Sequence, residues 1–213
     1  MRGICLLMNI DHWEYQNSMV DDIKIEDDCL SEFDLNVLKT NVFPNPDTGY
    51  TPPYYVDHII GKNVFDEVKK ETDSITHGMG QLEWKYNFQN VMLMYGEIND
   101  HFCTGIASDF YSWVIPIAAK INPKHMLRVK LNLGLCKDTH ILTGFHSDLE
   151  YDCTTSIFYV NTNNGYTQFK NGAKIESVEN RLISFPTHMK HCSVNQTDTP
   201  FRSVVNFNYY ARD

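Results

Sequence analysis

Apolar and polar residues alternate along two segments in the second half of the chain. The alternation runs over Leu127–Leu135, and again over Arg202–Tyr210, where Val205, Phe207 and Tyr209 share one side. Side chains two apart on a strand point to the same face. Each segment therefore predicts a strand with one apolar and one more polar face.

Shorter runs of β-branched and aromatic residues predict further strands in the same half of the chain. They cover Thr154–Val160, Tyr166–Phe169, Ala173–Ile175 and Arg181–Phe185. Asn171-Gly172 separates two of them and is typical of a hairpin turn. Several short strands with turn residues between them predict an all-β barrel or sandwich.

The first half of the chain has helical spacing and loop-forming stretches instead. Ser31 is placed to cap a helix that runs to about Lys39. Apolar residues at helical spacing predict a second helix over Ser108–Ile121, which Pro116 is expected to kink or shorten. Residues 41–56, rich in proline and tyrosine, and residues 87–104 are expected to be loops that contact a substrate.

The length of 213 residues is typical of one domain with a large core. We expect a single domain over residues 1–213, with a helical and loop part at 1–122 and a β core at 123–213. The fold class expected is mainly β with flanking helices.

Charge and cysteine usage exclude several functions. The net charge is −9, with 27 acidic and 18 basic residues, which argues against a duplex nucleic-acid surface and against anionic lipid. The six cysteines include no Cys-x-x-Cys pair, which makes a zinc ribbon improbable and favours reduced, mostly buried thiols. The apolar run at residues 4–8 is too short for a signal peptide or a membrane span. A cytoplasmic protein is expected.

The segment GFHSDLEYD, residues 144–152, contains candidate metal-binding residues. On a strand, His146 and Asp148 would point to one face and could hold a metal. A third ligand is available downstream from His188 or His191. Two histidines and one carboxylate form the facial triad that binds non-haem Fe(II) with positions left open. A His-x-Asp pair also arises by chance. The assignment of a metal site therefore depends on the other site residues as well as on this pair.

Arg202 lies eleven residues after His191 and opens a strand that is otherwise apolar or amide-bearing. An arginine at the mouth of a barrel is suited to a bidentate pair with an anionic ligand. A surface arginine on an edge strand is the alternative interpretation.

The order His146-x-Asp148, His191, Arg202 on short strands resembles the Fe(II)- and 2-oxoglutarate-dependent dioxygenases, and most closely their prolyl 4-hydroxylase-like branch. The likeness covers roughly residues 127–209. It is supported by the segments that resemble the family's strand motifs, which are Arg128–Leu135, Ile157–Asn161, Gly165–Phe169 and Ser184–Thr187. Two departures are Gly165 alone where the family has a glycine pair, and Arg202 where many prolyl hydroxylases have lysine.

The resemblance implies a double-stranded β-helix (jelly-roll) core in the C-terminal half of the chain. It implies Fe(II) held by His146, Asp148 and His191, and leaves His188 a surface or pocket-lining role. It also implies 2-oxoglutarate as cosubstrate, with Arg202 and Tyr159 at its distal carboxylate. Asn132, on the polar side of its strand, is a weaker candidate for a cosubstrate contact.

The activity implied is hydroxylation of a prolyl or other peptide side chain, with succinate and CO₂ released. Ascorbate is a candidate further requirement. The same chemistry on a small molecule or a nucleobase stays open. A metal-binding jelly-roll module without oxygenase activity is the alternative from another class. The sequence indicates neither the oligomeric state nor the identity of the substrate.

Overall fold

The computed structural model describes residues 22–43, 47, 88–98, 101–106, 108 and 110–212. Apart from residues 41–43 and Asp47, the expected loop at 41–56 lies outside this part of the chain. The helices and strands are β1 (Lys24–Glu26), α2 (Glu32–Val42), β2 (Phe88–Ile98), β3 (His101–Ile106), α5 (Tyr111–Ile121), β4 (His125–Leu135), β5 (Thr154–Tyr159), β6 (Tyr166–Phe169), β7 (Lys174–Glu176), β8 (Arg181–Pro186), β9 (His191–Val194) and β10 (Phe201–Tyr210).

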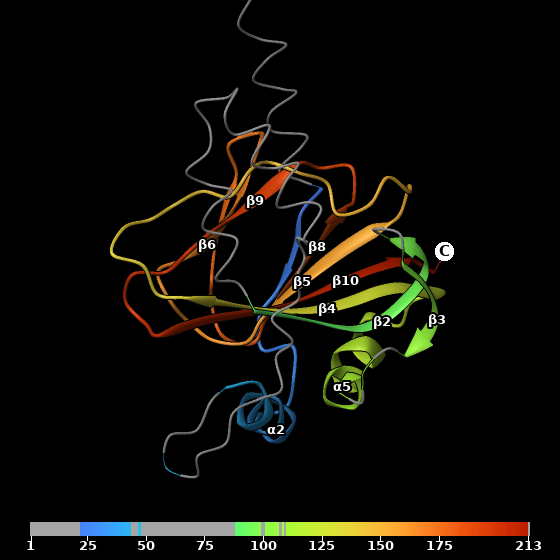
Figure 1. Cartoon of the computed structure of the whole chain (residues 1–213), viewed down its shortest axis with the longest axis horizontal. Helices are drawn as coiled ribbons and strands as arrows, with labels where there is room; N and C mark the ends of the chain where they lie inside the picture. The colour runs from blue at the N-terminus through green and yellow to red at the C-terminus, as the bar shows by residue number, and fades with distance from the viewer. Residues whose placement is uncertain are drawn as a thin grey trace, which may run out of the picture.

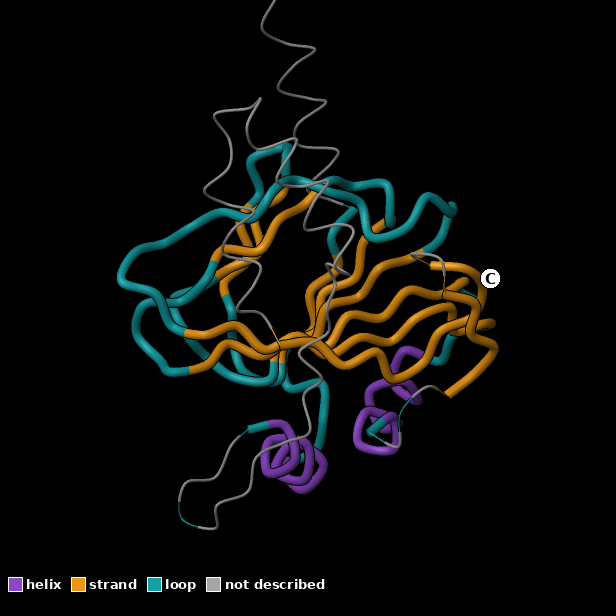
Figure 2. The backbone as a smooth tube through the Cα atoms, in the orientation of Figure 1, coloured by secondary structure: helices purple, strands orange, loops and turns teal. Residues whose placement is uncertain are grey.

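The strands form two sheets that face each other, as Figures 1 and 2 show. The larger sheet has the order β1-β8-β5-β10-β4-β2-β3, and the smaller has the order β7-β6-β9. Every strand pair in the described part is antiparallel. This mainly β architecture confirms the expected jelly-roll core with flanking helices.

Strands β4 and β10 lie side by side in the large sheet and divide their side chains between two environments. Their apolar positions, such as Leu131 and Phe207, join a buried core with the inner faces of α2 and α5. Burying a large apolar side chain contributes about 1.5–3 kcal/mol, so this face must turn toward the helices, which lie below the sheet in Figure 1. The polar positions of both strands therefore point toward the space between the sheets.

Helix α2 begins as the sequence predicts and ends three residues later than expected, at Val42. The Ser31 hydroxyl accepts a hydrogen bond from the Asp34 amide at 3.2 Å, which satisfies one of the free N–H groups of the first turn. Leu35, Leu38 and Val42 bury the inner face of the helix.

Helix α5 starts at Tyr111 rather than at Ser108, because the Ser108 hydroxyl accepts a hydrogen bond from the Phe110 amide in a turn that precedes the helix. Pro116 removes one backbone donor but does not end the helix, since the neighbouring Val114 and Ile117 are fully buried. Both helices are 11 residues long, and no helix in the described part is long and apolar enough to cross a membrane.

The expectation of a loop over residues 87–104 is wrong, because β2 and β3 occupy most of it and extend the large sheet beyond β4. Strand β9 was also not predicted, and it completes the small sheet. The hairpin turn at Asn171-Gly172 is confirmed: Gly172 has a φ of 97° and joins β6 to β7. Cys29, Cys136, Cys153 and Cys192 are free thiols, and of these four Cys136 is the exposed one.

The segment before α2 is tied to the β core by the side chain of Asn180. Its amide nitrogen donates to the Leu30 carbonyl at 2.9 Å, and its amide oxygen accepts from the Leu30 N–H at 2.8 Å. The Asn180 carbonyl also accepts from the Cys29 amide at 3.0 Å. Asn180 has a φ of 63°, a left-handed conformation that asparagine tolerates better than most residues.

Candidate metal centre and cosubstrate cavity

His146 and His191 face each other across an isolated β-bridge. The amide of each residue donates to the carbonyl of the other at 3.0 Å. The loop before Asp148 is thereby held against β9, and residues far apart in the sequence come together. The ring centroids of the two histidines are 5.0 Å apart.

The three predicted ligands form one cluster. The candidate ligand atoms of His146, Asp148 and His191 all lie within 4.8 Å of one another. The Nδ1 atom of His146 lies 3.0 Å from the Gly144 carbonyl oxygen, and that of His191 lies 3.2 Å from the Met189 carbonyl oxygen. A carbonyl oxygen only accepts, so each Nδ1 is the donor in these contacts and each Nε2 is the candidate ligand nitrogen.

Asp148 is the charged member of the cluster. Its side chain is almost completely buried, and Arg128 Nη2 lies 3.3 Å from its Oδ1. Burial opposes ionisation, but the charge of Arg128 leads the attractive interactions that hold the pKa of Asp148 well below its usual range. The carboxylate is therefore ionised at neutral pH, as a metal ligand must be.

Burial lowers the pKa of His191, which favours the neutral imidazole that binds metals. His188 is exposed and does not belong to the cluster. Two imidazoles and one hard carboxylate on one side of a cavity fit the donor set of non-haem Fe(II).

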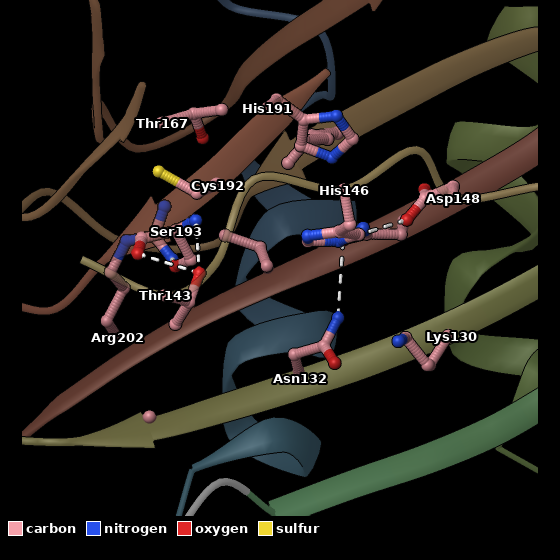
Figure 3. A pocket seen from close by; sticks show the side chains of 14 residues that line it. Lys130, Asn132, Thr143, His146, Asp148, Thr167, His191, Cys192, Ser193 and Arg202 are labelled. Carbon is pink, nitrogen blue, oxygen red and sulfur yellow. Dashed lines mark hydrogen bonds and ion pairs between the residues drawn. The ribbon is translucent and has the colours of Figure 1, made fainter. Parts of the chain in front are cut away.

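The cluster borders a cavity of about 90 Å³ between the two sheets (Figure 3). Its size is comparable with that of a small dicarboxylate, since about 10–15 Å³ of such volume holds one water. Side chains from the polar faces of β4 and β10 and from β9 line it, and the lining residues include Lys130, Asn132, Thr143, Thr167, Ser193, Arg202 and Asn206.

Arg202 lies away from the three ligands along the cavity (Figure 3). It is 6% exposed, and no carboxylate of the described residues forms an ion pair with it. Its Nε donates to Ser177 Oγ at 2.9 Å and its Nη1 to Ser193 Oγ at 2.8 Å. Burial lowers the pKa of Arg202, yet a guanidinium stays protonated in proteins. Within the described residues, Arg202 is thus a buried positive charge without a carboxylate countercharge.

Gly165 makes room for this arginine. A Cβ atom at that position would lie 2.8 Å from Arg202 Cδ and 2.8 Å from the Val194 carbonyl oxygen. These contacts are too close for any side chain, so the single glycine left from the family's pair has a steric role here.

Of the two other predicted cosubstrate contacts, one lines the cavity and the other lies behind its lining. Asn132 lines the cavity, and its Nδ2 donates to Asn206 Oδ1 at 3.3 Å. Tyr159 is fully buried behind the lining, with its ring centroid 5.7 Å from Arg202 Cζ. Its hydroxyl donates to Thr167 Oγ1 at 2.7 Å, and Thr167 reaches the cavity. Contact of either residue with 2-oxoglutarate stays a prediction.

Several residues that line the cavity or contact its ligand candidates were not identified from the sequence. Asn206 and Asn208 share the face of Arg202 on β10, so the alternation contained the signal for them. Thr167 lies in the segment that resembles the glycine-x-threonine-x-phenylalanine element of the family. Ser193 follows His191 by two residues, but nothing in the sequence indicated that this segment is a strand.

The comparisons with known proteins agree with the fold. No family model matches the sequence, and no curated protein matches it. Among solved structures, a prolyl hydroxylase from Trichoplax adhaerens, in complex with a peptide fragment of the hypoxia inducible factor oxygen degradation domain, is 10% identical. The match covers 94% of this chain and 90% of that one, with a TM-score of 0.50.

Two other similar structures are prolyl hydroxylases. The viral collagen prolyl hydroxylase of Paramecium Bursaria Chlorella virus-1 is 12% identical, with a TM-score of 0.48, and the match covers 90% of this chain and 97% of that one. A Pseudomonas putida prolyl-4-hydroxylase is 10% identical, with a TM-score of 0.44, and the match covers 92% and 98%. At these identities a likeness shows the fold alone. The chain has the prolyl 4-hydroxylase-like fold of the Fe(II)/2-oxoglutarate oxygenases, and its His-Asp-His cluster is one that could bind a metal.

Proposed function

We propose that the chain is an Fe(II)- and 2-oxoglutarate-dependent dioxygenase that hydroxylates an unactivated C–H bond of a prolyl or other peptide side chain. His146, Asp148 and His191 hold the metal, and Arg202 binds the distal carboxylate of 2-oxoglutarate. An Fe(II) centre of this class supplies oxidative chemistry, in which 2-oxoglutarate and dioxygen yield succinate, CO₂ and one oxygen atom inserted into the substrate.

The buried charge of Arg202 is the observation that carries this proposal. An isolated buried cation is costly, and burial is tolerated when the charge is paired. The two serine hydroxyls satisfy hydrogen bonds of the guanidinium but not its charge. A dicarboxylate with one end at the metal cluster and the other at Arg202 supplies the missing countercharge. A barrel that only bound a metal would not need a buried arginine to bind a carboxylate.

The side chains of this protein orient the metal ligands and the cosubstrate, and they exclude water. The Nδ1–H groups of His146 and His191 are fixed by backbone carbonyls, so neither imidazole can turn its protonated nitrogen toward the metal. The buried ring of Tyr159 lies beside the guanidinium and limits its movement. The polar lining of β4 and β10 offers amide groups to the remaining oxygens of the cosubstrate.

A titration of 2-oxoglutarate into anaerobic, Fe(II)-loaded protein tests the proposal, with the metal-to-ligand charge-transfer absorbance as the signal. Truncating one partner of a buried charge pair costs about 2–5 kcal/mol. At roughly 1.4 kcal/mol per tenfold, Arg202→Ala should weaken 2-oxoglutarate by about 30-fold or more. Arg202→Lys should weaken 2-oxoglutarate binding less, because the positive charge remains. Some loss is still expected, since lysine lacks the planar fork of the guanidinium.

Arg181→Ala is the matched control. That arginine pairs with Asp27 at the protein surface and does not line the cavity, so its loss should leave 2-oxoglutarate affinity unchanged. Asp148→Ala should abolish succinate production. If the native protein does not bind 2-oxoglutarate at millimolar concentration, a metal-binding jelly-roll module without oxygenase chemistry becomes the better assignment.

The substrate class is tested separately. The loaded protein, with ascorbate to keep iron reduced, is incubated with peptide pools and with small-molecule pools, and mass spectrometry identifies the component that gains one oxygen atom. A hydroxylated proline or other side chain in a peptide supports the proposal. A hydroxylated metabolite or nucleobase would instead keep the chemistry and replace the substrate.

A further inference from the structure

The amide of Asn208 joins the metal-ligand candidate Asp148 to Arg128. The Nδ2 of Asn208 donates to Asp148 Oδ2 at 3.1 Å and to Thr155 Oγ1 at 3.0 Å. Its Oδ1 accepts from Arg128 Nε at 2.9 Å. Arg128 Nη2 in turn lies 3.3 Å from Asp148 Oδ1, so the three residues form a closed ring.

The amide has one possible orientation in this ring. Arginine has donors alone, so it must face the amide oxygen of Asn208. The amide nitrogen then faces Asp148, and both of its hydrogens are used. Asn208 is fully buried and Arg128 is 8% exposed, which leaves neither side chain free to move into solvent.

Within this closed ring of residues, the two carboxylate oxygens of Asp148 make different contacts. Oδ2 is held by the Asn208 amide, whereas Oδ1 lies 3.8 Å from His146 Nε2, on the side of the ligand cluster. Arg128 Nη2 is buried and makes no hydrogen bond in the described part, so its contact with Oδ1 is an ion pair without hydrogen-bond geometry. Oδ1 is therefore the oxygen that remains available to a metal.

We propose that Asn208 is a positioning residue that makes Asp148 a one-oxygen metal ligand, and that Arg128 acts through Asn208 by fixing the orientation of its amide. This inference rests on the proposed metal site. The amide prevents the carboxylate from rotating and from offering both oxygens, which keeps coordination positions open for the cosubstrate. Loss of a residue that hydrogen-bonds a metal ligand typically changes metal affinity by about 10–100-fold.

Metal binding without cosubstrate is the test, measured with Mn(II) by electron paramagnetic resonance and with Co(II) by visible absorption. Asn208→Leu keeps the approximate volume and removes both hydrogen bonds of the ring. It should weaken Mn(II) binding by about 10–100-fold and alter the Co(II) spectrum. Thermal unfolding identifies variants that do not fold, and Asn208→Ser, which is too short to span Arg128 and Asp148, then replaces the leucine variant with the same expected result.

Asn161→Leu is the control, because the Asn161 amide hydrogen-bonds the Phe201 carbonyl and the Ser203 amide of the same strand, β10, and does not line the cavity. Its Mn(II) affinity and Co(II) spectrum should match those of the native protein. Equal losses in the Asn161 and Asn208 variants would overturn the proposal, because a general disturbance of β10 would then explain both.

Arg128→Met separates positioning from charge. The Arg128 charge repels a divalent cation but also favours the ionised Asp148, so a purely electrostatic role predicts a change in Mn(II) affinity that adds fully to the loss in Asn208→Leu. A positioning role predicts weaker binding, and predicts that Arg128→Met adds little further loss to Asn208→Leu. Tighter binding or fully additive losses would remove Arg128 from the proposal. Native Mn(II) affinity in Asn208→Leu would overturn it, whereas failure of the native protein to bind Mn(II) would overturn the proposed metal site itself.

Discussion

Replacing Asn180 by alanine should be among the most destabilising single changes in the described part of the chain. The change removes two buried hydrogen bonds and leaves the N–H and C=O of Leu30 without partners. Each such buried group costs about 1–3 kcal/mol. Alanine must also adopt the left-handed φ of 63°, at a cost of about 1–2 kcal/mol. We expect a total loss of about 3–8 kcal/mol.

Two further variants separate the hydrogen bonds from the backbone conformation. Asn180→Gly loses the same hydrogen bonds but adopts a left-handed φ without strain, so it should be destabilised slightly less than the alanine variant. Asn122, at the end of α5, has a similar φ of 48° and an exposed side chain. Asn122→Ala should therefore show the conformational cost of about 1 kcal/mol alone.

Urea unfolding followed by circular dichroism measures these differences as shifts in midpoint at constant m-value. The Asn180→Ala variant should also unfold on the order of 10 °C below the native protein. If Asn180→Ala were no less stable than Asn122→Ala, the two hydrogen bonds to Leu30 would contribute nothing. The attachment of this segment would then depend on the pairing of β1 with β8, the backbone hydrogen bond from Cys29 to Asn180 and apolar packing.

Three other predictions follow from separate features. Gly165→Ala should displace Arg202 and weaken 2-oxoglutarate strongly while Mn(II) affinity is retained, and equal losses of both ligands would contradict this steric account. Ser31→Ala should cost about 1 kcal/mol of unfolding free energy through the lost cap of α2, measured by urea unfolding. In the native protein at pH 8, iodoacetamide should modify the exposed Cys136 well before Cys29. The reason is that burial, more than any neighbouring charge, raises the pKa of Cys29 to about 11. Peptide mapping by mass spectrometry measures the order of modification.

The alternation along β4 and β10 was sufficient to predict both strands and the residues that share a face. It was not sufficient to say where the polar face points. On a half-exposed strand the polar residues face water, but here α2 and α5 cover the apolar face and the polar residues line a cavity. This is why Arg202 was identified by its resemblance to a family and Asn208, on the same face, was not.

The strands that the sequence did not predict are defined by contacts between distant residues. Strand β9 has four residues, and its pairing with β6 and the bridge from His191 to His146 set its position. Strand β2 pairs with β4, and β3 pairs with β2 at the edge of the sheet. Local pattern carries little of this information, because strand preference depends on the neighbours that a strand packs against. The division of the chain at residues 1–122 and 123–213 stays a prediction.

The bridge between His146 and His191 has a consequence for which ion the protein carries. Because backbone hydrogen bonds already hold the two imidazoles together, the ligands are in place before a metal arrives. A preformed site cannot use refolding to reject a wrong ion, and nitrogen and oxygen donors generally bind Ni²⁺, Cu²⁺ and Zn²⁺ more tightly than Fe²⁺. The metal supply of the host cell, rather than the polypeptide, would then decide the occupant. We expect protein isolated from different growth media to contain different metals at the same three ligands.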